Sequence, residues 1–119
     1  MSDSKTKKLV MFITDGIFIT HDRLVHIIKH RALLAGTVVA ALPFVLNSPG
    51  KIGDNSKKRS NSYVYCRKIG RIAIRVVVEE TKTPGISRVV SAFPMSLKDY
   101  EKLIDISGRA DIPPYESSH

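Results

Sequence analysis

Three apolar runs separated by short turn sequences constrain the fold of this chain more than any other feature. The runs cover residues Ser62–Lys68, Arg71–Glu80 and Ile86–Phe93. Gly70 lies in the first connection, and Pro84 and Gly85 lie in the second. Runs rich in β-branched residues are typical of strands, and glycine and proline are typical of the turns between them. The three runs therefore predict a β-meander, in which consecutive strands pair antiparallel.

The middle run alternates regularly enough to assign its two faces. The even-numbered positions from Ile72 to Val78 are all apolar, whereas Arg71 and Arg75 occupy odd-numbered positions. Successive side chains of a strand point to opposite faces of the sheet. One face of this strand is therefore expected in the core, and the other presents two guanidinium groups that can line a groove.

A hairpin is predicted before the meander. Leu9–Thr14 and Ile17–Thr20 are both β-prone, and the Asp15-Gly16 pair between them is a two-residue hairpin signal. An alternative is that Ile17–Thr20 only leads into the following helix. In that case Thr20 or Asp22 is the N-cap of the helix.

A first helix is predicted from His21 to about Leu34, and Gly36 is a suitable stop. Its apolar positions follow helical spacing, and they are Leu24, Ile27, Ile28 and Leu34. A second, buried helix is predicted at Val38–Leu46, with Pro43 bending or splitting it. Residues 50–62 are rich in Gly, Ser, Asn and Lys and predict an exposed basic loop.

The end of the chain predicts a closing helix. Pro94 is expected to end the last strand. Ser96 and Asp99 resemble a capping box that opens a helix through about Ile106, and Gly108 is expected to stop it. The fold class is therefore α+β, with N-terminal helices packed on a small antiparallel β-meander sheet and a closing C-terminal helix. One domain is expected at residues 9–108, between a flexible N-terminus (1–8) and a flexible tail (109–119).

Charge and cysteine content narrow the possible functions. Nineteen Lys and Arg residues against eleven Asp and Glu residues give a net charge of +8. Residues 51–75 hold eight of the basic residues and only Asp54 as an acid, which favours a nucleic-acid partner. The single Cys66 excludes an internal disulfide and is expected to be a small buried hydrophobe. No secretion signal is predicted, because Asp15-Gly16 breaks the apolar run that follows the N-terminal lysines and no small-residue cleavage site follows. No transmembrane helix is predicted, because the apolar stretch 37–46 is too short to span a bilayer.

His26 and His30 form the pattern that bears most directly on chemistry. Their i, i+4 spacing places both imidazoles on one helix face, with Arg23 on the same side and Lys29 adjacent. Imidazole exchanges protons near neutral pH, and cations stabilise a charged phosphodiester transition state. These groups fit a ribonuclease, in which the RNA 2′-OH is the nucleophile. The alternative is that both histidines are surface or half-buried residues of the helix with no role in chemistry.

A zinc site is a further alternative, because i, i+4 histidines can share a metal. The only additional ligands of the usual kind are His21, His119 and Cys66, and no paired Glu follows His26 as in metalloprotease helices. No metal and no other cofactor is expected.

Two segments resemble known nuclease domains. Leu24 to Gly36, LVHIIKHRALLAG, looks like the helix of colicin-D-type ribonuclease domains, in which a lysine-histidine pair followed by a glycine carries the general acid/base. Val89 to Pro94, VVSAFP, resembles the strand beside the active site of the wider barnase/EndoU/colicin family of bacterial toxin nucleases. The order of the elements is also similar, so the resemblance covers about residues 20–106.

The resemblance implies roles for individual residues. His30 matches the acid/base, Lys29 the neighbouring phosphate-binding cation, Ser91 the hydroxyl that contacts phosphate, and Phe93 the aromatic near the substrate. His26 has no counterpart and is expected to be a helper, so its substitution should cost less activity than that of His30. Phe93 stands where colicin-D domains favour tryptophan.

The meander supplies the remaining candidate site residues. Val89, Ser91 and Phe93 are expected to alternate onto one strand face near His30. A guanidinium binds phosphate with two donors, and the candidates are Arg67, Arg71, Arg75 and Arg88. Tyr65 shares a face with Arg67 and is a candidate for stacking on a base.

The residues and the resemblance together predict a metal-independent endoribonuclease toxin that cleaves tRNA or another structured RNA. The alternative is a non-catalytic basic module that binds RNA or DNA with strong salt dependence. The resemblance implies an acidic immunity or antitoxin protein as a partner. It also implies action in the cytoplasm, either as a free-standing chain or after delivery from outside as part of a larger toxin.

Overall fold

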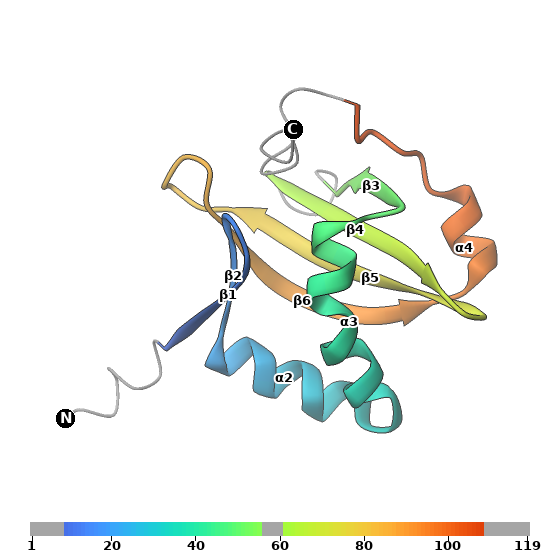
Figure 1. The fold of residues 1–119 in the computed structure, drawn as a ribbon, viewed down its shortest axis with the longest axis horizontal. Helices are drawn as coiled ribbons and strands as arrows, with labels where there is room; N and C mark the ends of the chain where they lie inside the picture. The colour runs from blue at the N-terminus through green and yellow to red at the C-terminus, as the bar shows by residue number, and fades with distance from the viewer. Residues whose placement is uncertain (1–8, 56–60, 109–119) are drawn as a thin grey trace.

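The computed structural model describes residues 9–55 and 61–108, and their strands form one six-stranded mixed sheet in the order β1-β2-β6-β5-β4-β3 (Figure 1). The strands are β1 (Val10–Thr14), β2 (Ile17–Thr20), β3 (Lys51–Asp54), β4 (Ser62–Ile69), β5 (Ile72–Glu80) and β6 (Ser87–Met95). The predicted meander is confirmed, since β4, β5 and β6 pair antiparallel in sequence order. The segments predicted to be a flexible N-terminus (1–8) and tail (109–119) lie outside the described residues.

The predicted hairpin is also confirmed. β1 and β2 pair antiparallel across a turn that contains Gly16, whose φ of 83° lies in the left-handed region that glycine tolerates. β2 then pairs parallel with β6, but only at Ile17 with Ser87 and at Phe18 with Arg88. The sheet is therefore mixed rather than purely antiparallel, and β6 has a strand neighbour on this edge only near its start.

Two predicted boundaries of the sheet are wrong. Lys51–Asp54 form β3 on β4, where the start of an exposed loop over residues 50–62 was expected. Residues 56–60 of that predicted loop lie outside the described residues. Ile52 of β3 is fully buried, but one apolar residue is too short a pattern to predict a strand. β6 continues through Pro94 to Met95 instead of ending at the proline. Proline is tolerated there because this part of β6 lies beyond its pairing with β2.

The helices differ from the predictions in their ends. They are α2 (His21–Arg31), the 3₁₀ helix η1 (Ala32–Leu34), α3 (Ala35–Asn47) and α4 (Leu97–Lys102). Gly36, the predicted stop, lies inside the first turn of α3, and Pro43 also lies within α3. The Ser96 cap is confirmed, because its hydroxyl accepts a hydrogen bond from the Asp99 amide at 3.1 Å. α4 nevertheless ends at Lys102, well before the predicted Ile106.

The residues after α4 follow β3 instead of continuing the helix. The Ile106 amide donates to the Ile52 carbonyl at 2.7 Å, and the Asp105 carboxylate accepts from the Ile52 amide at 3.1 Å. Gly53 of β3 lies under Leu103, whose Cδ1 would be 2.7 Å from an added Cβ. The C-terminal segment thus covers the outer edge of the sheet near β3.

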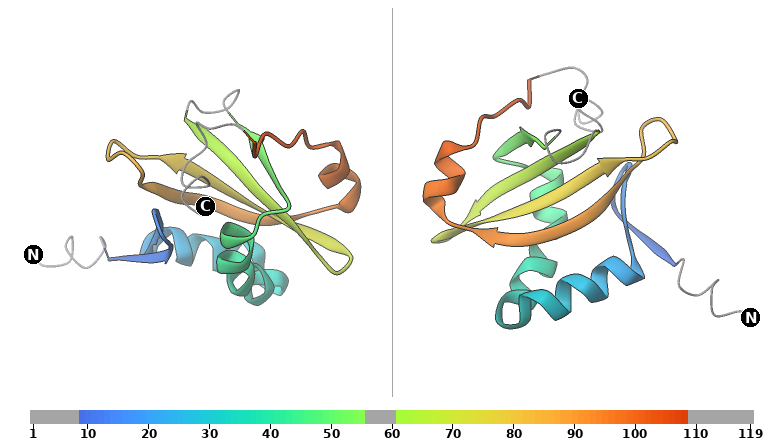
Figure 2. Two further views of the ribbon diagram at one scale, coloured as in Figure 1. Left: turned by 45° about the horizontal axis from the view of Figure 1, so that its top comes forward. Right: turned by 180° about the vertical axis from the view of Figure 1, so that it is seen from behind.

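The two faces of the sheet are covered by different helices. α2 and α3 pack on one face, here called the α3 face, and α4 lies on the other, here called the α4 face (Figure 2). The larger core is on the α3 face and includes Ile17, Ile27, Val38, Ile74, Val76 and Val89. The smaller core includes Val64, Cys66, Ala73 and Tyr100. The α+β architecture, with N-terminal helices packed on the sheet and a closing C-terminal helix, is therefore as predicted.

None of the helices within residues 9–55 and 61–108 is long and apolar enough to cross a membrane.

The burial of two adjacent isoleucines shows which face of α2 packs on the sheet. Ile27 is fully buried, whereas Ile28 is 46% exposed. We expect Ile27→Ala to lower the free energy of unfolding by about 2 to 5 kcal/mol, because it leaves a cavity in the core. Ile28→Ala is the matched control and should cost less than about 1 kcal/mol. Urea denaturation measures both values, and equal losses would contradict the assigned face of α2.

Candidate functional site

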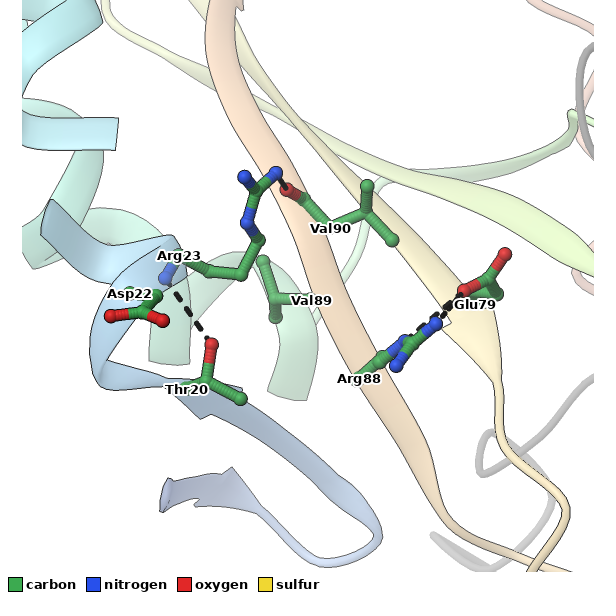
Figure 3. Close-up of a pocket in the computed structure, with 7 residues that line it drawn as sticks. All are labelled: Thr20, Asp22, Arg23, Glu79, Arg88, Val89 and Val90. Carbon is green, nitrogen blue, oxygen red and sulfur yellow. Dashed lines mark hydrogen bonds and ion pairs between the residues drawn. The ribbon is translucent and has the colours of Figure 1, made fainter. Parts of the chain in front are cut away.

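α2 lies along the part of β6 that has no strand neighbour. α2 begins directly after β2 and packs against β6. The Arg23 guanidinium donates through Nη1 to the Val90 carbonyl of β6 at 3.1 Å, as Figure 3 shows. The Arg23 amide in turn donates to the Thr20 hydroxyl at 3.2 Å, so Thr20 caps the helix. The side of α2 that carries Arg23 therefore faces the open edge of β6.

The two histidines follow Arg23 on the same side of α2. His26 and His30 stand at i+3 and i+7 from Arg23, and the buried Ile27 lies beside this row. The two imidazole rings are in contact, with centroids 4.1 Å apart and planes inclined at 43°. His26 is half-buried and His30 is exposed. The structure therefore brings the predicted histidine pair together at the edge of the sheet.

Lys29 lies on the exposed part of α2, at i+3 from His26. It is two positions from the buried Ile27, which places it about 200° around the helix from the core side. Lys29 is exposed, as expected for the solvent side of α2. Its role as the cation beside His30 stays a prediction.

A β-bulge in β6 decides where Ser91 and Phe93 point. Val78 of β5 is opposite Val89, but the neighbouring Val77 is opposite Ser91, so Val90 is the extra residue. Val89 is in the core on the α3 face. Ser91 and Phe93 lie after the bulge and point to the α4 face. The prediction that Val89, Ser91 and Phe93 share one face is therefore wrong, because the bulge interrupts the alternation.

Two of the predicted arginines share the α4 face with Ser91 and Phe93. The guanidinium of Arg75 lies 5.4 Å from the ring centroid of Phe93, directly across from it in the sheet. Arg88 donates to Glu79 Oε1 through Nε at 3.1 Å and through Nη2 at 2.6 Å. Arg75, Arg88, Ser91 and Phe93 therefore form one strip along β5 and β6.

A cleft of about 420 Å³ lies where this strip meets the start of α2 (Figure 3). Its lining residues are Thr20, Asp22, Arg23, Glu79, Arg88, Val89 and Val90. Two carboxylates and two guanidinium groups give it no formal net charge. Such a cleft suits a polar group that has both donors and acceptors better than it suits a bare phosphate. Asp22 and Glu79 were not predicted as site residues, because no pattern in the sequence around them indicates that they line a cleft.

The other predicted substrate-binding residues lie elsewhere. Tyr65 is 1% exposed within the core on the α3 face, so it does not stack on a base. Burial, with smaller effects of Tyr63 and Glu80, raises the pKa of Tyr65. Arg67 also belongs to the α3 face, where its guanidinium lies 4.1 Å from the ring centroid of Phe44.

Arg67 also donates to the Ser48 carbonyl at 2.6 Å, which ties it to the end of α3. Arg71 is exposed in the connection between β4 and β5. The four arginines predicted to contact phosphate therefore do not share one surface. The pleat assigns Arg67 and Arg75 to opposite faces of the sheet.

The described part of the chain contains no group of three or more His, Cys, Asp or Glu side chains arranged to hold a metal ion. Of the zinc ligands considered above, Cys66 is fully buried and His119 lies outside the described residues. The histidine pair of α2 therefore has no third ligand of these kinds within residues 9–55 and 61–108.

No protein-family model matches the chain, and no curated protein or solved structure shows significant similarity to it.

The burial of Cys66 generates a test of its predicted role as a core residue. Burial raises the pKa of the Cys66 thiol to about 11, although Arg75 and Lys51 oppose this shift. The thiol is therefore neutral and covered at pH 8, and thiolate is the reactive form. We expect the native protein to resist a thiol-modifying reagent at pH 8 and the urea-denatured protein to react fully. Rapid labelling of the native protein would contradict the assigned burial.

Proposed function

We propose that this chain is a metal-independent endoribonuclease toxin that cuts tRNA or another structured RNA. The observation that carries the proposal is the contact between His26 and His30 at the open edge of β6. The same strand presents Ser91 and Phe93 on the α4 face, where β5 adds Arg75, so these groups lie across this edge from α2, which packs on the α3 face. This arrangement supplies proton transfer, a hydroxyl donor and positive charge, which are the requirements of RNA transesterification without a metal.

The proposed reaction uses a nucleophile from the substrate. A neutral imidazole removes the proton from the RNA 2′-OH, and the 2′ oxygen attacks the adjacent phosphorus. A protonated imidazole gives its proton to the departing 5′ oxygen, so the products are a 2′,3′-cyclic phosphate and a 5′-OH. His30 and His26 are the two candidates for these roles, and their contact supports a larger role for His26 than the resemblance implies.

Charge stabilisation in this reaction falls to the α4 face. Arg75 carries a permanent charge next to Phe93 and is the candidate for the pentacoordinate phosphorane. Ser91, two residues from Phe93 on the same strand, is the candidate donor to a phosphate oxygen. Arg88 lies near the start of β6, three residues before Ser91, where it contributes to binding rather than to the reacting phosphate.

The partner and the place of action follow from the same proposal. A net charge of +8 favours RNA as substrate. The resemblance to toxin nucleases implies an acidic immunity or antitoxin protein as the inhibitor that covers the site. The enzyme then acts in the cytoplasm, either made there or delivered from outside as part of a larger toxin in bacterial competition.

A non-catalytic module that binds RNA or DNA is the second candidate. The observation in its favour is the spread of the basic residues, because Lys29, Arg67 and Arg75 occupy three different surfaces. Such a distribution suits sequence-independent electrostatic binding, which weakens steeply with salt.

One experiment separates these candidates. We expect the purified chain to cleave total RNA in the presence of EDTA and to leave 2′,3′-cyclic phosphate ends. His30→Ala should lower the rate by at least about 10²-fold, because a proton-transfer group is lost. His26→Ala should lower it by less. Gel electrophoresis with enzymatic analysis of the product ends measures each rate.

The matched control is His21→Ala, which removes an exposed histidine of the same helix and should leave the rate unchanged. Intact RNA that the protein binds in a salt-sensitive manner would support the binding module instead. Cleavage that stops in EDTA and returns with zinc would contradict the metal-independent mechanism.

A further inference from the structure

The β6 bulge positions Ser91 through the peptide bond that joins Val90 to Ser91. The Val90 carbonyl and the Ser91 amide belong to the same planar peptide unit. The Arg23 guanidinium donates to this carbonyl at 3.1 Å. The hydrogen bond therefore holds the peptide plane immediately before Ser91, at the position where the bulge turns the strand.

On the edge of β6 that faces α2, no described strand pairs with Val90, so its carbonyl accepts a hydrogen bond from a side chain instead. β2 pairs with β6 only at Ile17 and Phe18, opposite Ser87 and Arg88. Beyond these positions, the described residues place α2 rather than a strand beside β6. A helix cannot continue the hydrogen-bond ladder with its backbone, so the carbonyl at the bulge takes its donor from Arg23.

Arg23 also sits at a fixed position relative to the histidines. Its own amide is bonded to the Thr20 hydroxyl at the start of α2, and His26 follows one turn later on the same side. Arg23 therefore connects the side of α2 that carries His26 and His30 to the bulge that orients Ser91. An arginine suits this task because its planar donors have a defined direction.

We propose that Arg23 is a positioning residue, which sets Ser91 and Phe93 in register with the His26–His30 pair by holding the Val90 bulge. This inference rests on the proposed ribonuclease function and adds the residue that assembles its two halves. Arg23 acts through the backbone of β6, so it is distinct from the candidates that touch the RNA.

The first test compares Arg23→Ala, Arg23→Lys and Lys82→Ala in RNA cleavage. Lys82 is exposed in the turn between β5 and β6, so Lys82→Ala controls for the loss of one positive charge. We expect Arg23→Ala to lower kcat by about 10- to 100-fold with little change in KM, because misplacement of reacting groups acts on the chemical step. Arg23→Lys, which retains one donor, should recover part of the rate, and Lys82→Ala should match the parent.

The second test is a double-mutant cycle with Ser91→Ala. If Arg23 acts by aiming Ser91, Arg23→Ala should cost at least about threefold less in the Ser91→Ala background than in the parent. Fully additive losses would overturn the proposal. A rise in KM with unchanged kcat would also overturn it, because it would make Arg23 a direct contact of the RNA.

The third test does not depend on catalysis. Hydrogen exchange at the amides of Ser91 and Ala92 should be faster in Arg23→Ala than in the parent, and unchanged in Lys82→Ala. If the parent protein cleaves no RNA, the proposed function fails, while this measurement still decides whether Arg23 holds the bulge. Unchanged exchange in a folded Arg23→Ala variant would overturn the positioning role.

Discussion

The short parallel pairing of β2 with β6 is the constraint on which the candidate site depends. It covers two residues of each strand, after which the chain turns directly into α2. Had β2 continued along β6, its backbone would have filled the edge that now faces Arg23, His26 and His30. Because it stops, a helix occupies this edge of β6 and brings to it the side of α2 that carries Arg23, His26 and His30.

The bulge at Val90 is the second consequence of that short pairing. A strand with neighbours on both edges is held in register by two ladders, whereas this part of β6 is paired with a strand only on the β5 side. The extra residue is accommodated, its carbonyl is bonded by Arg23, and Ser91 and Phe93 turn to the α4 face. The face opposite the main core thereby gains the hydroxyl and the aromatic ring, together with Arg75.

The predictable part of the site is the part encoded within one element. The contact of His26 with His30 follows from helical spacing alone, and the pairing of Arg75 with the α4 face follows from the alternation in β5. The face of Ser91 was mispredicted because a bulge depends on the neighbouring strand. Tyr65 and Arg67 were correctly placed on one face of the sheet, but only the packing of α3 makes that face a core. The exposure of Lys29 likewise depends on the side of α2 that Ile27 buries.

The amino-acid sequence by itself determined the elements whose patterns are local: the hairpin at Gly16, the helix with the histidine row, the three strands of the meander and the Ser96 cap. Tertiary structure decided β3, which contains one buried apolar residue and is hydrogen-bonded to β4 on one side and to the C-terminal segment on the other. It also decided the early ends of α2 and α4, the parallel joint between β2 and β6, and the cleft lined by Asp22 and Glu79. The physical reason is that periodicity reports the burial of one face, whereas register, bulges and edges are set by hydrogen bonds to residues far away in the chain.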